Sequence, residues 1–136
     1  INLDRDDVAA LSELPKIEIM MAQAKAWDES YYFGGAWLFE GVYFGARNEM
    51  MGGNPERSKA AFERNLKLTE GKMLITPYFY ARTYCIFNQD KKCFDENLKR
   101  VLDAPGDIHP GQRLANVLAK KKAERLVKRR ADFFVD

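Results

Sequence analysis

Two helix-length segments of the sequence are almost free of charge, and they constrain the fold of this chain more than any other feature. Residues 30–46 carry a single charged residue, Glu40, and residues 73–89 carry a single one, Arg82. A helix without a polar face has to be covered on most of its sides by other parts of the protein. The sequence therefore predicts two inner helices with more polar neighbours around them.

The aromatic residues gather in the same two segments. Of the 17 aromatic side chains, seven lie in residues 31–44 and five in residues 75–87. With 46% hydrophobic residues the chain is too apolar for disorder, and 136 residues are enough for one domain with its own core. The longest uncharged run covers residues 30–39, whereas a membrane-spanning helix needs about twenty apolar residues.

Glycine, proline and asparagine turn signals divide the chain into helix-sized pieces, and no segment alternates as a strand does. We therefore expect a single all-helical domain over residues 1–136 with about seven helices. The predicted helices cover residues 4–11, about 12–27, 31–47, 56–69, 75–88, 91–103 and 110–134, of which the last is the longest.

An amphipathic segment follows each apolar one, at residues 56–69 and 91–103. This pairing of an inner with an outer helix occurs twice, about forty residues apart, and is typical of arrays of helical hairpins. Trp37, Gly41 and Phe44 match the spacing of the tetratricopeptide pattern, although the outer helices match it only in part. The predicted fold class is an all-α, tetratricopeptide-like helical-hairpin solenoid with a long C-terminal helix.

The rings and lone charges of the inner helices have two interpretations. Rings at helical spacing usually belong to a core, but tyrosine hydroxyls also supply the polar contacts of a ligand cavity. A lone charge on an apolar helix needs a partner. We expect Glu40 and Arg82 either to pair with each other or to face a shared wet cavity, where Arg82 can receive a carboxylate; alternatively, each reaches solvent at a helix edge. The candidate ligand- or pore-lining residues are Tyr32, Trp37, Glu40, Tyr43, Tyr78, Tyr80, Arg82 and Tyr84.

Three glycines lie on one face of the first inner helix. Gly34, Gly41 and Gly45 are spaced i, i+7 and i+11. Glycine destabilises a helix interior by about 1 kcal/mol relative to alanine, so this face needs a reason. It predicts the close approach of a neighbouring helix or, alternatively, room for a ligand or a partner's backbone.

Two cysteines lie on either side of the turn that follows the second inner helix. Cys85 and Cys93 are either two small buried side chains or, in an oxidising compartment, a disulfide across the hairpin. The sequence leaves both alternatives open.

The charge is distributed unevenly along the chain. The net charge is +2, but residues 1–70 hold 8 basic and 12 acidic residues, and residues 71–136 hold 14 and 8. The basic face of the last helix can be a solvated surface, or it can contact a partner or a membrane. The small net charge and the lack of a recognised nucleic-acid module argue against nucleic acid. The candidate partner or surface residues are Lys120, Lys121, Arg125, Lys128 and Arg129.

Residue patterns of enzymes and metal sites are missing from the sequence. His109 stands alone in a loop, and there is no glycine-rich phosphate loop, nucleophile elbow or cysteine pair at metal spacing. We expect no catalytic residues, no metal and no cofactor, and we interpret the protein as a non-enzyme.

Several short stretches together resemble a known family. They are YYFGG at residues 31–35, LFEGVY at 38–43, GGNPE at 52–56, FER at 62–64, NQD at 88–90 and RLANVLA at 113–119. In this order and spacing the sequence is similar to the T-component (TatT) family of tripartite ATP-independent periplasmic (TRAP) transporters. The resemblance covers nearly all of residues 25–125.

The resemblance implies a bacterial periplasmic lipoprotein that associates with the transporter's solute-binding P-component and holds or passes an organic acid or hydrophobic ligand. It also implies a possible homotrimer, a lipid anchor outside this fragment as the only membrane contact, and a chain that forms the C-terminal part of a longer protein. The alternative is a general tetratricopeptide-like adaptor for protein–protein interactions.

Overall fold

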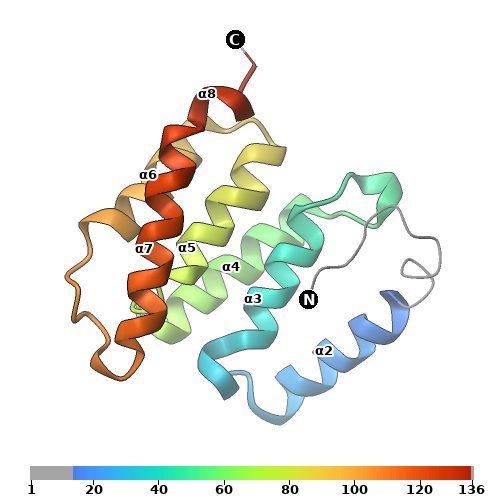
Figure 1. Ribbon diagram of the computed structural model, residues 1–136. Helices are drawn as coiled ribbons and strands as arrows, with labels where there is room; N and C mark the ends of the chain where they lie inside the picture. The colour runs from blue at the N-terminus through green and yellow to red at the C-terminus, as the bar shows by residue number, and fades with distance from the viewer. Residues whose placement is uncertain (1–13, 136) are drawn as a thin grey trace.

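The computed structural model describes residues 14–135, which form helices and no strand (Figure 1). The expectation of an all-helical fold is confirmed, and the opening helix predicted at residues 4–11 lies outside the described residues. The α-helices are α2 (Leu14–Asp28), α3 (Tyr31–Gly45), α4 (Pro55–Thr69), α5 (Ile75–Tyr80), α6 (Lys91–Asp103), α7 (Arg113–Lys128) and α8 (Arg130–Phe133). Between them lie the 3-10 turns η1 (Glu49–Met51) and η3 (Pro110–Gln112) and the π-helical turn η2 (Ala81–Cys85).

The prediction of one continuous helix over residues 110–134 is wrong, because the structure divides this segment into η3, α7 and α8. The chain leaves the helical conformation at Arg129, with φ −99° and ψ 11°. This turn brings Phe133 and Phe134 over the buried ring of Phe94, with ring centroids 6.5 and 5.1 Å away. Packing of these two rings therefore goes together with the break in the helix.

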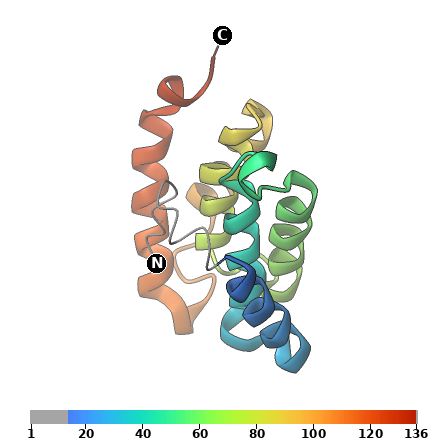
Figure 2. The same cartoon turned by 90° about the vertical axis from the view of Figure 1, so that its right-hand side faces the viewer.

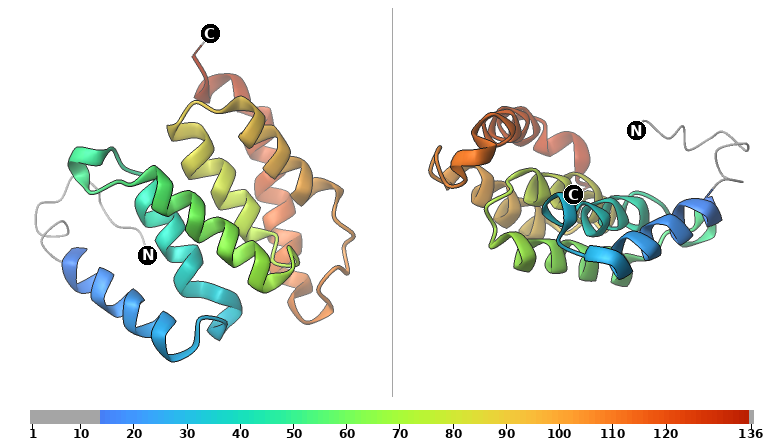
Figure 3. Two further views of the ribbon diagram at one scale, coloured as in Figure 1. Left: turned by 180° about the vertical axis from the view of Figure 1, so that it is seen from behind. Right: turned by 90° about the horizontal axis from the view of Figure 1, so that it is seen from below.

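Helix α5 occupies the middle of the molecule. It contacts α3, α4, α6 and α7, and its continuation η2 contacts α3, α4 and α6. At one edge α2 packs on α3, and at the opposite edge α7 packs on α5 and α6 (Figures 1 and 3). Figure 2 shows α7 running along one side of the molecule. The two apolar segments are thus the covered helices that the sequence predicts.

The glycines of α3 allow α4 to pack closely against it. A Cβ atom on Gly41 would lie 2.8 Å from the ring of Phe62, and one on Gly45 would collide with the hydroxyl of Ser58. The Ser58 hydroxyl donates a hydrogen bond of 2.6 Å to the Gly41 carbonyl. The prediction of a closely approaching helix is confirmed, and that helix is α4.

Side-chain caps define where the outer helices begin. The Asn54 side chain accepts a hydrogen bond from the Arg57 backbone N–H at 3.1 Å, with Pro55 in the first turn of α4. The Asp90 side chain caps α6 in the same way, accepting from the Cys93 N–H at 3.0 Å. Both caps satisfy backbone donors that have no partner inside the helix.

A disulfide joins η2 to α6. Cys85 and Cys93 are bonded, with their Cα atoms 5.5 Å apart. Of the two alternatives that the sequence leaves open, the structure has the disulfide. This bond fastens the π-helical turn to its outer neighbour next to the candidate site described below.

Candidate ligand cleft

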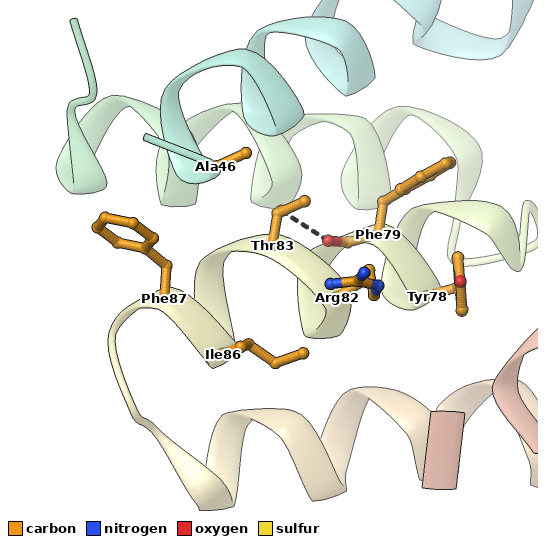
Figure 4. Close-up of a pocket in the computed structure, with 7 residues that line it drawn as sticks. All are labelled: Ala46, Tyr78, Phe79, Arg82, Thr83, Ile86 and Phe87. Carbon is orange, nitrogen blue, oxygen red and sulfur yellow. Dashed lines mark hydrogen bonds between the residues drawn. The ribbon is translucent and has the colours of Figure 1, made fainter. Parts of the chain in front are cut away.

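An open cleft of about 440 Å³ lies over α5 and η2 (Figure 4). Most of its wall comes from a single face of the continuous helix formed by α5 and η2, and Ala46, the residue just after α3, lines the cleft from the α3 side (Figure 4). The lining residues are Ala46, Tyr78, Phe79, Arg82, Thr83, Ile86 and Phe87. The cleft therefore combines aromatic and aliphatic walls with one cationic side chain.

The π-helical turn places the charged residue of this cleft. The backbone changes from α-helix to π-helix at Ala81, and the hydroxyl of Thr83 donates a 2.7 Å hydrogen bond to the Phe79 carbonyl (dashed in Figure 4). Single π-helical turns inside helices are rare and occur frequently at functional sites. Arg82 projects from this turn and is exposed.

Positive charge gathers around the cleft. The Arg82 guanidinium carbon lies 5.4 Å from the centroid of the Phe133 ring, and that of Arg129 lies 5.0 Å from the same ring. The ammonium group of Lys122 lies 5.9 Å from the centroid of Tyr78. No acidic side chain of the described residues pairs with Arg82. Its planar, five-donor fork is thus available to an anion, and such groups bind carboxylates bidentately.

Only two of the predicted lining residues, Tyr78 and Arg82, line this cleft. Tyr80 is buried and stacks on Phe62 of α4, with centroids 4.8 Å apart, and its hydroxyl donates to Glu63 at 3.1 Å. Burial and the neighbouring Glu63 carboxylate raise the pKa of the Tyr80 hydroxyl. Tyr84 packs edge-on against Tyr80. These two rings belong to the core between α5 and its neighbours.

Glu40 is 3% exposed and bridges two other helices. Its carboxylate pairs with Lys25 of α2 at 2.8 Å and with Arg57 of α4 at 2.6 Å. The predicted pairing of Glu40 with Arg82 is therefore wrong. The two inner helices present these residues to different neighbours, so each lone charge has a different environment: one is buried and paired, and the other is exposed at a helix edge.

Trp37 and Tyr43 lie on the same side as Glu40. The Trp37 indole N–H donates to Glu29 at 3.1 Å, and the Lys25 ammonium lies 4.1 Å from the Trp37 ring centroid. Tyr43 is buried beneath the guanidinium of Arg47, 4.5 Å from the ring centroid. Trp37 thus contacts charged groups that join α2, α3 and α4, whereas Tyr43 packs in an apolar cluster with Met21 of α2. Neither ring lines the cleft.

Tyr32 is 77% exposed and sits in an unusual backbone turn. Tyr32, Phe33 and Gly34 all have positive φ values, of 50°, 58° and 69°. The Asn65 side chain donates to the carbonyls of Phe33 and Gly34 at 3.0 and 2.8 Å and so holds this left-handed turn in place. Consecutive non-glycine residues in this conformation are strained.

The basic residues predicted at the surface divide into two groups. Lys120 is half-buried and donates to the carbonyls of Leu102 and Ala104, which leaves it engaged at the end of α6. Arg129 forms an ion pair with Asp132, with 3.6 Å between the Arg129 Nε and the Asp132 Oδ2. The other three are exposed and have no acidic partner in the described part of the chain: Lys121, Arg125 and Lys128.

Part of the cleft could have been found from the sequence. Tyr78, Arg82 and Ile86 are spaced i, i+4 and i+8 and share a face of the helix (Figure 4). The contact of the Phe133 ring with the Arg82 guanidinium depends on the turn between α7 and α8, and no local pattern signals it. Within residues 14–135, no group of histidine, cysteine and acidic side chains could hold a metal ion. None of the helices described there has the length and apolar character needed to cross a bilayer.

Comparison with known proteins adds evidence independent of this geometry. A family model described as TRAP transporter T-component matches residues 1–134 of the chain. The chain is 29% identical over 130 residues to a protein of Treponema pallidum (strain Nichols) described as an uncharacterized protein. This alignment covers 94% of the chain but 40% of that relative, so the chain spans well under half of the relative's length.

Proposed function

We propose, since the chain belongs to the TRAP transporter T-component family, that it binds the transporter's periplasmic solute-binding protein and helps to hold or transfer an organic acid or hydrophobic ligand. The family is one of transporter accessory proteins and is not a known enzyme family. An accessory role in TRAP transport is thus the setting in which the cleft over η2 has to be understood.

The observation that carries the ligand proposal is the position of Arg82. An exposed guanidinium without an acidic partner stands in a cleft of about 440 Å³ whose other walls are mostly apolar. Ligand pockets usually combine apolar walls with a few oriented polar groups in volumes of about 300–1,000 Å³. A carboxylate with an apolar body fits this arrangement, with the acid on Arg82 and the body against Tyr78 and Phe79.

Further features of the fold support the family's setting. The succession of inner and outer helices favours a tetratricopeptide-like solenoid. We also propose that the chain is part of a lipoprotein of the bacterial periplasm, and that this lipoprotein can form homotrimers. The Cys85–Cys93 disulfide supports this location, because such bonds persist in oxidising compartments such as the periplasm. We assign the docking of the solute-binding protein to the unpaired cations Lys121, Arg125 and Lys128 on α7.

Calorimetric titration with a panel of aliphatic and aromatic carboxylates tests the ligand proposal. Arg82→Leu should weaken binding about 10- to 100-fold, since hydrogen bonds to charged groups contribute about 1.5–3 kcal/mol. Arg113→Leu is the matched control, because Arg113 is exposed at the start of α7 and does not line the cleft. Equal affinities of the wild type and Arg82→Leu would refute the assignment of this cleft.

A pull-down separates this function from that of a general adaptor. A T-component should retain a periplasmic solute-binding protein from an extract of its own organism. Retention of unrelated peptides or proteins, with none of the solute-binding protein, would favour the adaptor.

A further inference from the structure

The disulfide between Cys85 and Cys93 joins two residues in different surroundings. Cys85, at the end of η2, is 0% exposed and belongs to the hydrophobic core. Cys93 is half-buried and lies in the first turn of α6. Of the two residues, Cys93 is therefore the one that solvent reaches. The first turn of a helix also stabilises a thiolate, which makes a cysteine there more reactive.

A buried polar atom beside this disulfide has no partner. Asn97 of α6 is 5% exposed, and its side-chain Nδ2 lies 3.7 Å from each of the two sulfur atoms. This nitrogen donates to the Cys93 carbonyl at 2.9 Å, but the Asn97 Oδ1 has no hydrogen-bond partner among the described residues. A disulfide has no hydrogen to donate, whereas a thiol does. Reduction therefore supplies a donor for an acceptor that the disulfide form leaves unsatisfied.

The disulfide also anchors the helix that forms the cleft. Cys85 is the last residue of η2, and Thr83 before it and Ile86 after it line the cleft (Figure 4). Arg82 belongs to the same π-helical turn, three residues before Cys85. The bond to Cys93 ties this turn covalently to α6. Breaking it removes a constraint on the turn that places the cation of the cleft.

We propose that Cys85–Cys93 is a redox-active disulfide, which a dithiol reductant opens in the folded protein and which thereby controls how firmly η2 holds Arg82. Structural disulfides of secreted proteins resist reduction by glutathione, whereas the less stable ones are regulatory or catalytic. The unsatisfied Asn97 acceptor places this bond in the second group, because a buried acceptor without a donor destabilises the form in which it occurs. The consequence for ligand binding rests on the proposed function of the cleft, and the redox step does not.

The reaction is a thiol–disulfide exchange in two steps. A thiolate of the reductant attacks the Cys93 sulfur, and the electron pair of the broken S–S bond leaves with the Cys85 sulfur, which takes up a proton. The second thiolate of the reductant then attacks the mixed disulfide and releases Cys93 as a thiolate. The protein gains two electrons, and the reductant becomes a disulfide. Of the two protons that the reductant loses, one goes to Cys85 and the other to Cys93 or to water.

Equilibration of the natural full-length protein in glutathione buffers tests the redox step. Alkylation followed by mass spectrometry gives the reduced fraction, and circular dichroism of the same samples reports the fold. We expect the wild type to pass from disulfide to dithiol while it stays folded. A protein that stays oxidised at every glutathione ratio, or that loses the disulfide only together with its fold, would overturn the proposal.

A variant of Asn97 tests the cause. Asn97→Leu should lower the equilibrium constant for reduction at least about 5-fold, because leucine carries no acceptor and removes the preference for the dithiol. Asn48→Leu is the matched control, since it makes the same change on the exposed cap of η1 and should leave the constant unchanged. Equal constants for the wild type and Asn97→Leu would contradict the proposal. If Asn97→Leu does not fold, the measurement on the wild type still decides.

Amide hydrogen exchange tests whether the bond controls η2. On reduction, exchange at residues 81–86 should accelerate at least about 10-fold more than exchange in the middle of α4. Equal acceleration in both segments would overturn the control of Arg82 by the disulfide. A carboxylate that binds the oxidised protein should bind the reduced protein more weakly. Absence of carboxylate binding in both states would instead refute the proposed function of the cleft, while exchange and redox equilibrium still decide this inference.

Discussion

Removing the charge of Glu40 should destabilise the fold strongly, because this carboxylate holds α2 and α4 to α3. In Glu40→Gln the shape is nearly unchanged, but both ion pairs are lost. Lys25, whose side chain is 19% exposed, is left largely buried without its anion, whereas Arg57, at 51%, regains water easily. The loss should therefore come mainly from Lys25.

The magnitude follows from these exposures. A hydrogen bond to a charged group contributes about 1.5–3 kcal/mol when buried. The exposed Arg57 pair contributes about 0.5–1 kcal/mol, since solvent screens it. Together they predict a loss of about 2–4 kcal/mol, or a fall in Tm of about 8–16 °C for a domain of this size.

Urea denaturation followed by circular dichroism measures this loss. The transition midpoint should fall while the slope m stays constant, because the surface exposed on unfolding does not change. Glu49→Gln, an exposed acid on η1, should lie within about 0.5 kcal/mol of the wild type. If Glu40→Gln also lies within this range, the reasoning about the buried pair is refuted. A double-mutant cycle with Lys25→Met should return most of the loss as coupling energy.

Three further outcomes are expected. Gly41→Ala should lower the free energy of unfolding by about 1–3 kcal/mol, because its methyl group would meet a buried ring. Gly106→Ala, with open space around it, should leave this free energy unchanged. Similar losses for both variants in urea titrations would contradict the close packing of α4. Reduction of the Cys85–Cys93 disulfide should lower the free energy of unfolding of the wild type by about 2–3 kcal/mol. The same reducing agent should leave the free energy of unfolding unchanged in a variant with serine at both positions. A hydrogen bond from Arg64 of α4 lowers the pKa of Glu29 below its ordinary value of 4.5. The stabilisation that this ionised carboxylate provides is therefore complete above pH 4.5 and is lost as the pH falls through the lowered value. Glu29→Gln should lack this acid-dependent loss when Tm is titrated against pH, and a profile equal to that of the wild type would remove the assignment.

Local sequence signals were sufficient for most of the fold. Turn signals in the sequence predicted the starts of the outer helices to within a residue or two, and in the structure Asn54 and Asp90 cap these helices. The apolar segments around Glu40 and Arg82 correctly identified the covered helices. The glycine spacing of α3 predicted a close neighbour because only a missing side chain allows that approach.

The site was less predictable, because it depends on how helices face one another. Glu40 and Arg82 each stand alone in sequence, and nothing local shows that Lys25 and Arg57 reach the first while the second stays at an edge. Most of the tyrosines that looked like cavity walls stack in the core or contact charged groups instead. The turn at Arg129 that places Phe133 beneath Arg82 results from tertiary packing, which helix propensity does not report.

Direct titration of the natural full-length protein with the solute-binding protein of its TRAP transporter tests the central claim, which is the accessory role in transport. We predict saturable binding that weakens with added salt and is lost when Lys121, Arg125 and Lys128 are changed together to glutamate. Reversal of the exposed Lys59, Lys67 and Lys92 should leave binding unchanged. Absence of binding by the wild-type protein at any salt concentration would contradict the account.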